Sequence, residues 1–221
     1  MSKAKKAVLS VTDSIKEKYE EKIFFPESRK RLTNDNFSII SPNCYAGLMY
    51  HRLGKQFLSP TINLHFPIRK KYLKFCQNLE HYMSVPLTFI DDKTYGNHPV
   101  GMLDDVMLVF NHYKSAQEAE EAWYKRRTRV NYDNLFMIFD DIKDATYEDL
   151  LEFNKIPCKG KVIFTAKQYD DLPNAVQITK YRKKGTLGMY LTEKNVFTGK
   201  NPADKVFDFV EWLNGNPNYK K

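Results

Sequence analysis

Five apolar residues followed by two carboxylates make up residues 135–141, Leu135-Phe136-Met137-Ile138-Phe139-Asp140-Asp141. A short, continuous apolar run of this kind is typical of a strand that is buried on both faces of a sheet. Similar runs occur at residues 37–40, 61–64, 87–90, 106–110 and 162–165. Longer stretches with helical spacing separate them. The alternation predicts an α/β fold, a three-layer sandwich with a mostly parallel sheet of about five to seven strands and helices on both faces.

Helix boundaries can be read from proline and from capping residues. Helical spacing predicts helices over residues 46–53, 67–83, 116–129 and 203–213. Pro67 opens the second of these. Ser115 and Glu118 form a capping box before the third, and Thr146 with Asp149 marks the start of one more helix.

Length and composition predict one cytoplasmic domain. The 221 residues are 42% hydrophobic, which is enough for a single core, here assigned to residues 33–221. Residues 1–32 form a basic arm with nine Lys/Arg and five Asp/Glu, which suits peripheral contact with the inner face of the membrane. We expect no secretory signal and no membrane span, because no apolar stretch reaches the required ~20 residues. Three widely spaced cysteines favour free thiols over a disulfide framework or a metal site.

Ligands of open α/β sheets bind beyond the carboxyl ends of the strands, where polar residues gather in this sequence. Cys44, at the start of a helix, is the predicted nucleophile, because helix N-terminal N–H groups lower a thiol pKa. His112 is the predicted general base, and Asp140 or Asp141 would orient it. Each residue could instead have a structural role. Cys44 could be a small apolar residue in a tight turn, His112 a structural histidine, and Asp140 and Asp141 caps of the following turn. Predicted substrate-binding residues are Ser41, Asn43, Asn111, Arg126, Arg127, Arg129, Asn131 and Lys167.

Other sites have less support in the sequence. His51, His65, His81 and His98 are weaker histidine candidates, and no metal site is predicted. The glycine-rich dinucleotide loop, the phosphate-binding Gly-Lys-Ser/Thr loop, the Gly-x-Ser-x-Gly elbow and the His-Glu-x-x-His helix are all missing. Many common hydrolases and cofactor enzymes are therefore disfavoured.

Four motifs carry a resemblance to a known family. They are Asn-Phe-Ser-Ile-Ile-Ser-Pro-Asn-Cys-Tyr-Ala-Gly (36–47), Leu-Gly-Lys-Gln-Phe-Leu-Ser-Pro-Thr (53–61), His-Tyr-Lys-Ser (112–115) and Arg-Val-Asn-Tyr-Asp-Asn-Leu-Phe (129–136). Together they resemble a bacterial exopolysaccharide and capsule biosynthesis family that is catalogued as a domain of unknown function. The resemblance spans about residues 30–215. It implies a role in making or decorating a surface glycan, with a site at Cys44 and His112.

Three functions remain open on this reading. The first is a transferase that moves an acyl group from acyl-coenzyme A to a sugar hydroxyl through Cys44, with the coenzyme phosphates near Arg126, Arg127 and Arg129. The second is a glycosyltransferase with a nucleotide-sugar donor, acting on a saccharide or a lipid-linked glycan precursor. The third is a non-catalytic accessory protein of polysaccharide biosynthesis. The net charge of +8 suits anionic partners, but no nucleic-acid partner is predicted.

Overall fold

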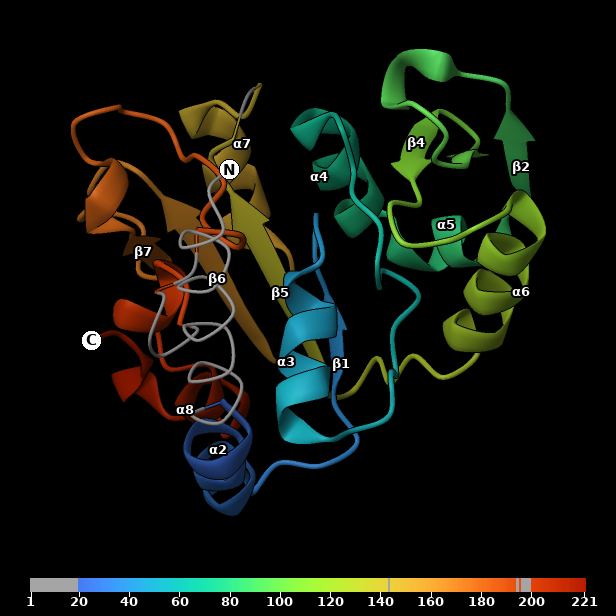
Figure 1. The fold of residues 1–221 in the computed structure, drawn as a ribbon. Helices are drawn as coiled ribbons and strands as arrows, with labels where there is room; N and C mark the ends of the chain where they lie inside the picture. Colours follow the sequence, from blue (N-terminus) through green and yellow to red (C-terminus); the bar gives the residue numbers. More distant parts are fainter. Residues whose placement is uncertain (1–19, 143, 194, 196–199) are drawn as a thin grey trace, which may run out of the picture.

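A parallel sheet of four strands forms one half of the molecule (Figure 1). The computed structural model describes residues 20–142, 144–193, 195 and 200–221. The strands are β1 (Ser38–Ile40), β5 (Leu135–Asp140), β6 (Gly160–Thr165) and β7 (Ala175–Gln177), in the order β1-β5-β6-β7. Every residue of β1 and β5 is buried, which explains their continuous apolar sequence.

Helices pack on both faces of this sheet. On one face lie α3 (Tyr45–Leu53) and α8 (Phe209–Leu213). The ring centroids of Tyr45 and Phe164 are 5.5 Å apart, and those of Trp212 and Phe136 are 5.0 Å apart. On the other lie α4 (Arg69–Gln77) and α7 (Tyr147–Lys155), which pack against Phe139. Two aromatic-rich cores therefore fix the sheet from both sides.

A separate antiparallel sheet of three strands forms the other half, with α5 (Leu79–Ser84) and α6 (Ala116–Arg127) beside it (Figure 1). Its strands are β2 (Leu87–Ile90), β3 (Val100–Leu103) and β4 (Val106–Val109). The sequence predicted runs 87–90 and 106–110 as members of the parallel sheet, and this is wrong. Only Asp104 and Asp105 join β3 to β4, whereas a parallel pair needs a crossover of a dozen or more residues.

The α/β class is thus confirmed, while a three-layer sandwich with five to seven strands in one sheet is not. Residues 61–64 form no strand. The predicted helix 67–83 is divided into α4 and α5 at Asn78, and the predicted helix 203–213 is divided into a short 3-10 turn (Ala203–Lys205) and α8. Ser115 and Thr146 cap α6 and α7 as predicted.

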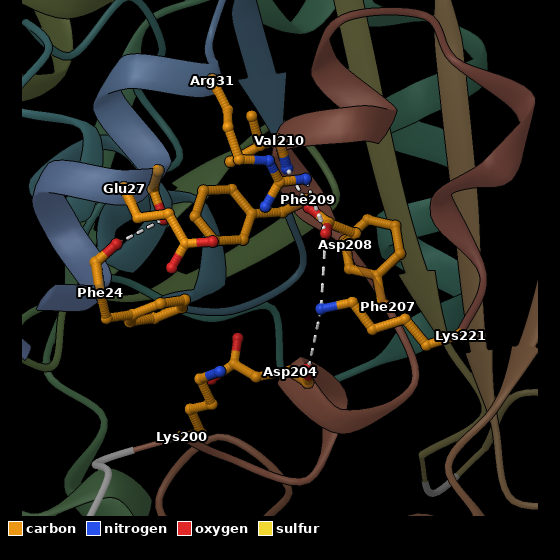
Figure 2. A pocket seen from close by; sticks show the side chains of 11 residues that line it. Phe24, Glu27, Arg31, Lys200, Asp204, Phe207, Asp208, Phe209, Val210 and Lys221 are labelled. Atoms are coloured by element: carbon orange, nitrogen blue, oxygen red, sulfur yellow. Dashed lines mark hydrogen bonds and ion pairs between the residues drawn. The ribbon is translucent and has the colours of Figure 1, made fainter.

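Part of the predicted basic arm contacts the domain. A π-helical turn (Glu20–Phe24) leads into α2 (Phe25–Arg31), and Arg31 donates hydrogen bonds to Asp208 at 2.8 Å and Glu211 at 2.6 Å. Figure 2 shows this docking point beside Phe209. Residues 1–19 lie outside the described part of the chain. The domain boundary at residue 32 stays a prediction. Among the described residues, no helix is long and apolar enough to cross a membrane.

Candidate functional site

A cavity of about 750 Å³ lies where the carboxyl end of the parallel sheet meets the last strand of the small sheet. Its polar side is made by Asn43, Cys44, His65, Arg69, Asn111 and His112. Leu48, Ile142 and the segment 187–192 line the rest. Ligand-binding cavities commonly have about 300–1,000 Å³ and a few convergent polar groups in an apolar lining. The predicted residues Cys44 and His112 therefore share one cavity, although β4 brings His112 there from a different sheet than predicted.

Cys44 is not an activated thiol in this structure. It is the N-cap of α3, and its Sγ donates to the backbone carbonyl of Leu64 at 3.8 Å. Burial raises the pKa of the Cys44 thiol to about 11, so the prediction of a lowered pKa is wrong. The cause is the loss of hydration on burial, which disfavours the charged thiolate.

His65 is the histidine that the fold orients. Its backbone exchanges two hydrogen bonds of 2.9 Å with Val109, which brings the ring beside Asn111 at the end of β4. Asn111 Oδ1 lies 2.9 Å from His65 Nδ1. With Oδ1 as acceptor, the ring proton is assigned to Nδ1. Asn111 thus orients His65, whereas the sequence predicted an aspartate that orients His112.

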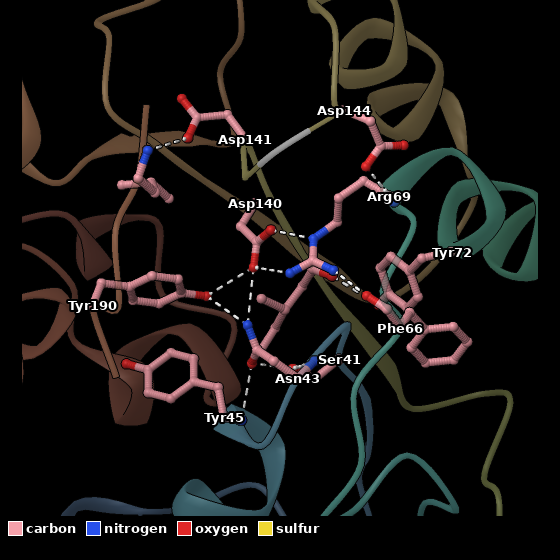
Figure 3. A network of polar contacts seen from close by, with 12 residues as sticks. Ser41, Asn43, Tyr45, Phe66, Arg69, Tyr72, Asp140, Asp141, Asp144 and Tyr190 are labelled. Atoms are coloured by element: carbon pink, nitrogen blue, oxygen red, sulfur yellow. Dashed lines mark hydrogen bonds and ion pairs between the residues drawn. The ribbon is translucent and has the colours of Figure 1, made fainter. Parts of the chain in front are cut away.

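Asp140 belongs to a buried ion pair rather than to a histidine, which corrects its predicted role (Figure 3). The carboxylate is fully buried and accepts from Arg69 Nε and, at 3.3 Å, from Nη2. Asn43 Nδ2 and Tyr190 Oη also donate to Asp140 Oδ2, at 2.9 and 3.2 Å. Burial by itself would lower the pKa of Arg69, but the charge of Asp140 raises it above its ordinary value. These contacts form a rigid polar floor under the cavity.

The Arg69 backbone is held as firmly as its side chain. Its N–H donates to Asp144 Oδ1 at 2.9 Å, and the next N–H, of Lys70, donates to Oδ2 at 3.2 Å. Asp144 thereby caps α4 from a loop that follows β5, because a carboxylate satisfies the exposed N–H groups of a helix start.

Asp141 holds two neighbouring backbone segments. Its Oδ2 accepts from Ala166 N at 2.7 Å and its Oδ1 from Leu187 N at 3.3 Å. Burial raises the pKa of Asp141 to about 6. Ser41 Oγ donates to Asn43 Oδ1 at 3.2 Å and supports the floor, while Lys167 is exposed and does not line the cavity.

Basic residues at the end of α6 have structural contacts instead of facing the cavity. Arg126 donates to Tyr113 Oη at 2.5 Å, Arg127 to Val85 O at 3.1 Å, and Arg129 to Phe57 O at 3.5 Å. The amide N–H of Asn131 donates to Ser38 Oγ at 2.8 Å, at the opposite end of β1 from Cys44. Six of the eight predicted substrate-binding residues thus lie outside the cavity lining, and only Asn43 and Asn111 are part of it: the six are Ser41, Arg126, Arg127, Arg129, Asn131 and Lys167.

The sequence analysis missed Arg69 and Tyr190 and gave little weight to His65. Arg69 lies five residues after the apolar run 61–64 and two residues after Pro67, near a predicted helix start. Cys44 was selected for its place at a helix start, and the same criterion applied to Arg69. No local pattern marks Tyr190. Within the ranges that the structure describes, no group of three or more His, Cys, Asp or Glu side chains is arranged to hold a metal ion.

Comparison with known proteins places the chain among uncharacterised relatives. A family model described as "Domain of unknown function (DUF1919)" matches residues 15–214. An uncharacterized protein of Haemophilus influenzae is 37% identical to the chain over 186 residues, which cover 84% of this chain and 88% of that protein. The family match includes both sheets and every residue named above on the cavity wall.

Proposed function

The chain belongs to the family described as Domain of unknown function (DUF1919), and from this premise we propose that it is a transferase of surface-polysaccharide biosynthesis. The acceptor is a saccharide hydroxyl of the glycan or its precursor, bound in the cavity of about 750 Å³. The donor is an acyl-coenzyme A or a nucleotide sugar. The link to exopolysaccharide and capsule genes rests on the sequence motifs alone.

One observation carries the proposal, the contact of 2.9 Å between His65 Nδ1 and Asn111 Oδ1 on the cavity wall. Transfer to a hydroxyl group needs a base that removes its proton as the new bond forms. Histidine serves this role most often, and the contact with Asn111 fixes the orientation of the His65 ring on the cavity wall. We place His65 as the base and His112, exposed on the same wall, as a second contact for the saccharide.

The state of Cys44 favours direct transfer over a covalent thioester. With a pKa of about 11, about one thiol in ten thousand is ionised at pH 7. A mechanism through Cys44 would also need a base that takes its proton, whereas its Sγ donates to the Leu64 carbonyl. Cys44 is therefore proposed as a wall residue, and the group passes directly from donor to acceptor without a covalent enzyme intermediate. The acceptor oxygen bonds to the transferred group, His65 takes the hydroxyl proton, and the bond to the coenzyme A sulfur or to the nucleoside diphosphate breaks.

The test is a transfer assay with matched histidine variants. The full chain is incubated with a saccharide acceptor and either acyl-coenzyme A or nucleotide sugars, and mass gain of the acceptor is followed by mass spectrometry. His65→Gln should lower the rate by about 10²–10⁴-fold, as expected for loss of a general base. His81→Gln is the control, because His81 is exposed, pairs with Asp104 and lies on α5.

The outcome separates the alternatives. Product from acyl-coenzyme A identifies an acyltransferase, and product from a nucleotide sugar identifies a glycosyltransferase. Equal rates for His65→Gln and His81→Gln would refute His65 as the base. Binding of saccharide without transfer from any donor would favour a non-catalytic accessory protein.

We also propose that the protein works in the cytoplasm, at the inner face of the membrane. The charge of residues 1–32 supports this, because clustered lysines are attracted to anionic headgroups. Vesicles containing phosphatidylglycerol should bind the full chain at low salt. Replacement of Lys3, Lys5 and Lys6 by Gln should weaken that binding, and equal binding to neutral vesicles would contradict it.

A further inference from the structure

The non-polar side of the same cavity points to a second part of the substrate. It is built by five aliphatic side chains, Leu48, Ile142, Leu187, Met189 and Leu191. Met189 is 69% exposed, although methionine side chains are usually buried. We propose that this wall binds a hydrocarbon chain carried by the substrate whose polar part meets His65 and Asn111. The inference rests on the proposed function and specifies its substrate class as an amphiphile.

The apolar wall is a built feature rather than a loose loop. Leu187 N donates to Asp141 Oδ1 at 3.3 Å, and Tyr190 Oη donates to Asp140 Oδ2 at 3.2 Å, so two points of the segment are fixed to the end of β5. Gly188 packs so closely on Tyr181 that an added Cβ would lie 2.7 Å from the ring. The segment therefore holds Met189 in place while leaving its side chain exposed.

Tyr190 lies between the polar and the apolar parts of the cavity lining. Its side chain is buried toward Asp140 and Asn43 (Figure 3), while its neighbours Met189 and Leu191 are exposed and partly exposed. These apolar side chains and the polar residues Asn43, His65 and Arg69 line the same cavity. Exposed apolar surface that is continuous with convergent polar groups marks a binding site for a ligand of mixed polarity.

The ligand that fits this wall is a flexible hydrocarbon chain attached to a polar group. Two kinds of substrate carry such a chain. The chain belongs either to a lipid-linked saccharide acceptor or to the acyl group of a thioester donor. Methionine and leucine adapt to such chains because their contacts are non-directional.

The test uses alkyl maltosides on the full chain, each below its micelle concentration. Calorimetry compares maltose with its hexyl, octyl and decyl glycosides. Affinity should rise about twofold to fourfold for each methylene, the lower limit applying to a half-exposed chain. From hexyl to decyl the gain is then at least about 16-fold. Affinity that does not change with chain length would overturn the inference.

Two serine variants locate the binding. Met189→Ser should weaken decyl maltoside by at least about fivefold, since it removes most of one apolar side chain. The control is Ile90→Ser, because Ile90 is also an exposed aliphatic residue, at 43%, but lies on β2 away from this cavity. Equal losses in the two variants, or a loss in Ile90→Ser alone, would overturn the inference.

Competition identifies the source of the chain. Displacement of decyl maltoside by farnesyl phosphate supports a lipid-linked acceptor, and displacement by decanoyl-coenzyme A supports an acyl donor. Displacement by neither would overturn the inference. The transfer assay with His65→Gln is read independently, so failure of chain binding leaves the proposed reaction testable, and failure of the reaction leaves chain binding testable.

Discussion

Replacing Asp140 by Asn probes the buried floor of the cavity with a change of one charge and almost no volume. Asp140 is fully buried and accepts from both Nε and Nη2 of Arg69, from Asn43 and from Tyr190. An amide in its place can accept through only one atom, and its NH₂ group would face other donors. The guanidinium of Arg69, 4% exposed, would be left without a counter-charge.

The expected loss is large because a buried charge loses its partner. Removing one member of a buried ion pair typically lowers the free energy of unfolding by about 3–5 kcal/mol. For a chain of this size, each kcal/mol shifts Tm by about 2–4 °C, so Asp140→Asn should melt roughly 10 °C lower. The double variant Arg69→Met with Asp140→Leu should recover at least half of that loss, because both charges are then removed.

Urea unfolding at pH 7 measures these differences. Asp204→Asn is a matched control, because Asp204 pairs with Arg52 in a second buried ion pair and both side chains are 2% exposed. Asp204→Asn should also lower the free energy of unfolding, but it should leave the affinity for decyl maltoside unchanged. Asp140→Asn should lower both the free energy of unfolding and the affinity for decyl maltoside. A loss below about 1 kcal/mol for Asp140→Asn, or no recovery in the double variant, would refute the assignment of a desolvated ion pair.

Three further predictions test other parts of the structure. Burial raises the pKa of Asp141 to about 6, so the folded state holds the proton of this carboxyl more tightly than the unfolded state does. The protonated carboxyl therefore stabilises the fold below pH 4, and this stabilisation is lost as the pH rises through 6. Between pH 4 and 7, wild type should therefore lose about 2 kcal/mol relative to Asp141→Asn in urea unfolding, and parallel pH profiles would contradict this. The Cys44 thiol should react slowly with iodoacetamide at pH 7, with a rate that rises about tenfold per pH unit up to about pH 10, and rapid labelling at neutral pH would show a lowered pKa instead. Gly160→Ala should lower stability by about 1–3 kcal/mol, because the new Cβ would lie 2.7 Å from the ring of Phe136, and an unchanged Tm would show that this ring moves freely.

Local sequence was sufficient for elements whose signals lie within a few residues. The strands at 38–40, 135–140 and 160–165 follow from continuous apolar runs, since a parallel strand covered on both faces needs apolar side chains on each. The starts of α6 and α7 follow from Ser115 and Thr146, whose side chains satisfy N–H groups in the same turn. The position of Cys44 at the start of α3 follows from the strand and helix on either side.

The sequence alone determined the α/β class and most strands and helix starts, because each depends on local periodicity and on chain direction; that His112 shares a cavity with Cys44 was decided by how the antiparallel sheet packs beside the parallel one. Tertiary structure alone decided how the strands divide between two sheets and which polar groups meet. His65 pairs with Asn111 across 46 positions, and Arg69 pairs with Asp140 across 71. Such contacts are chosen by packing and by the need to neutralise a buried charge, and neither leaves a local pattern in the chain.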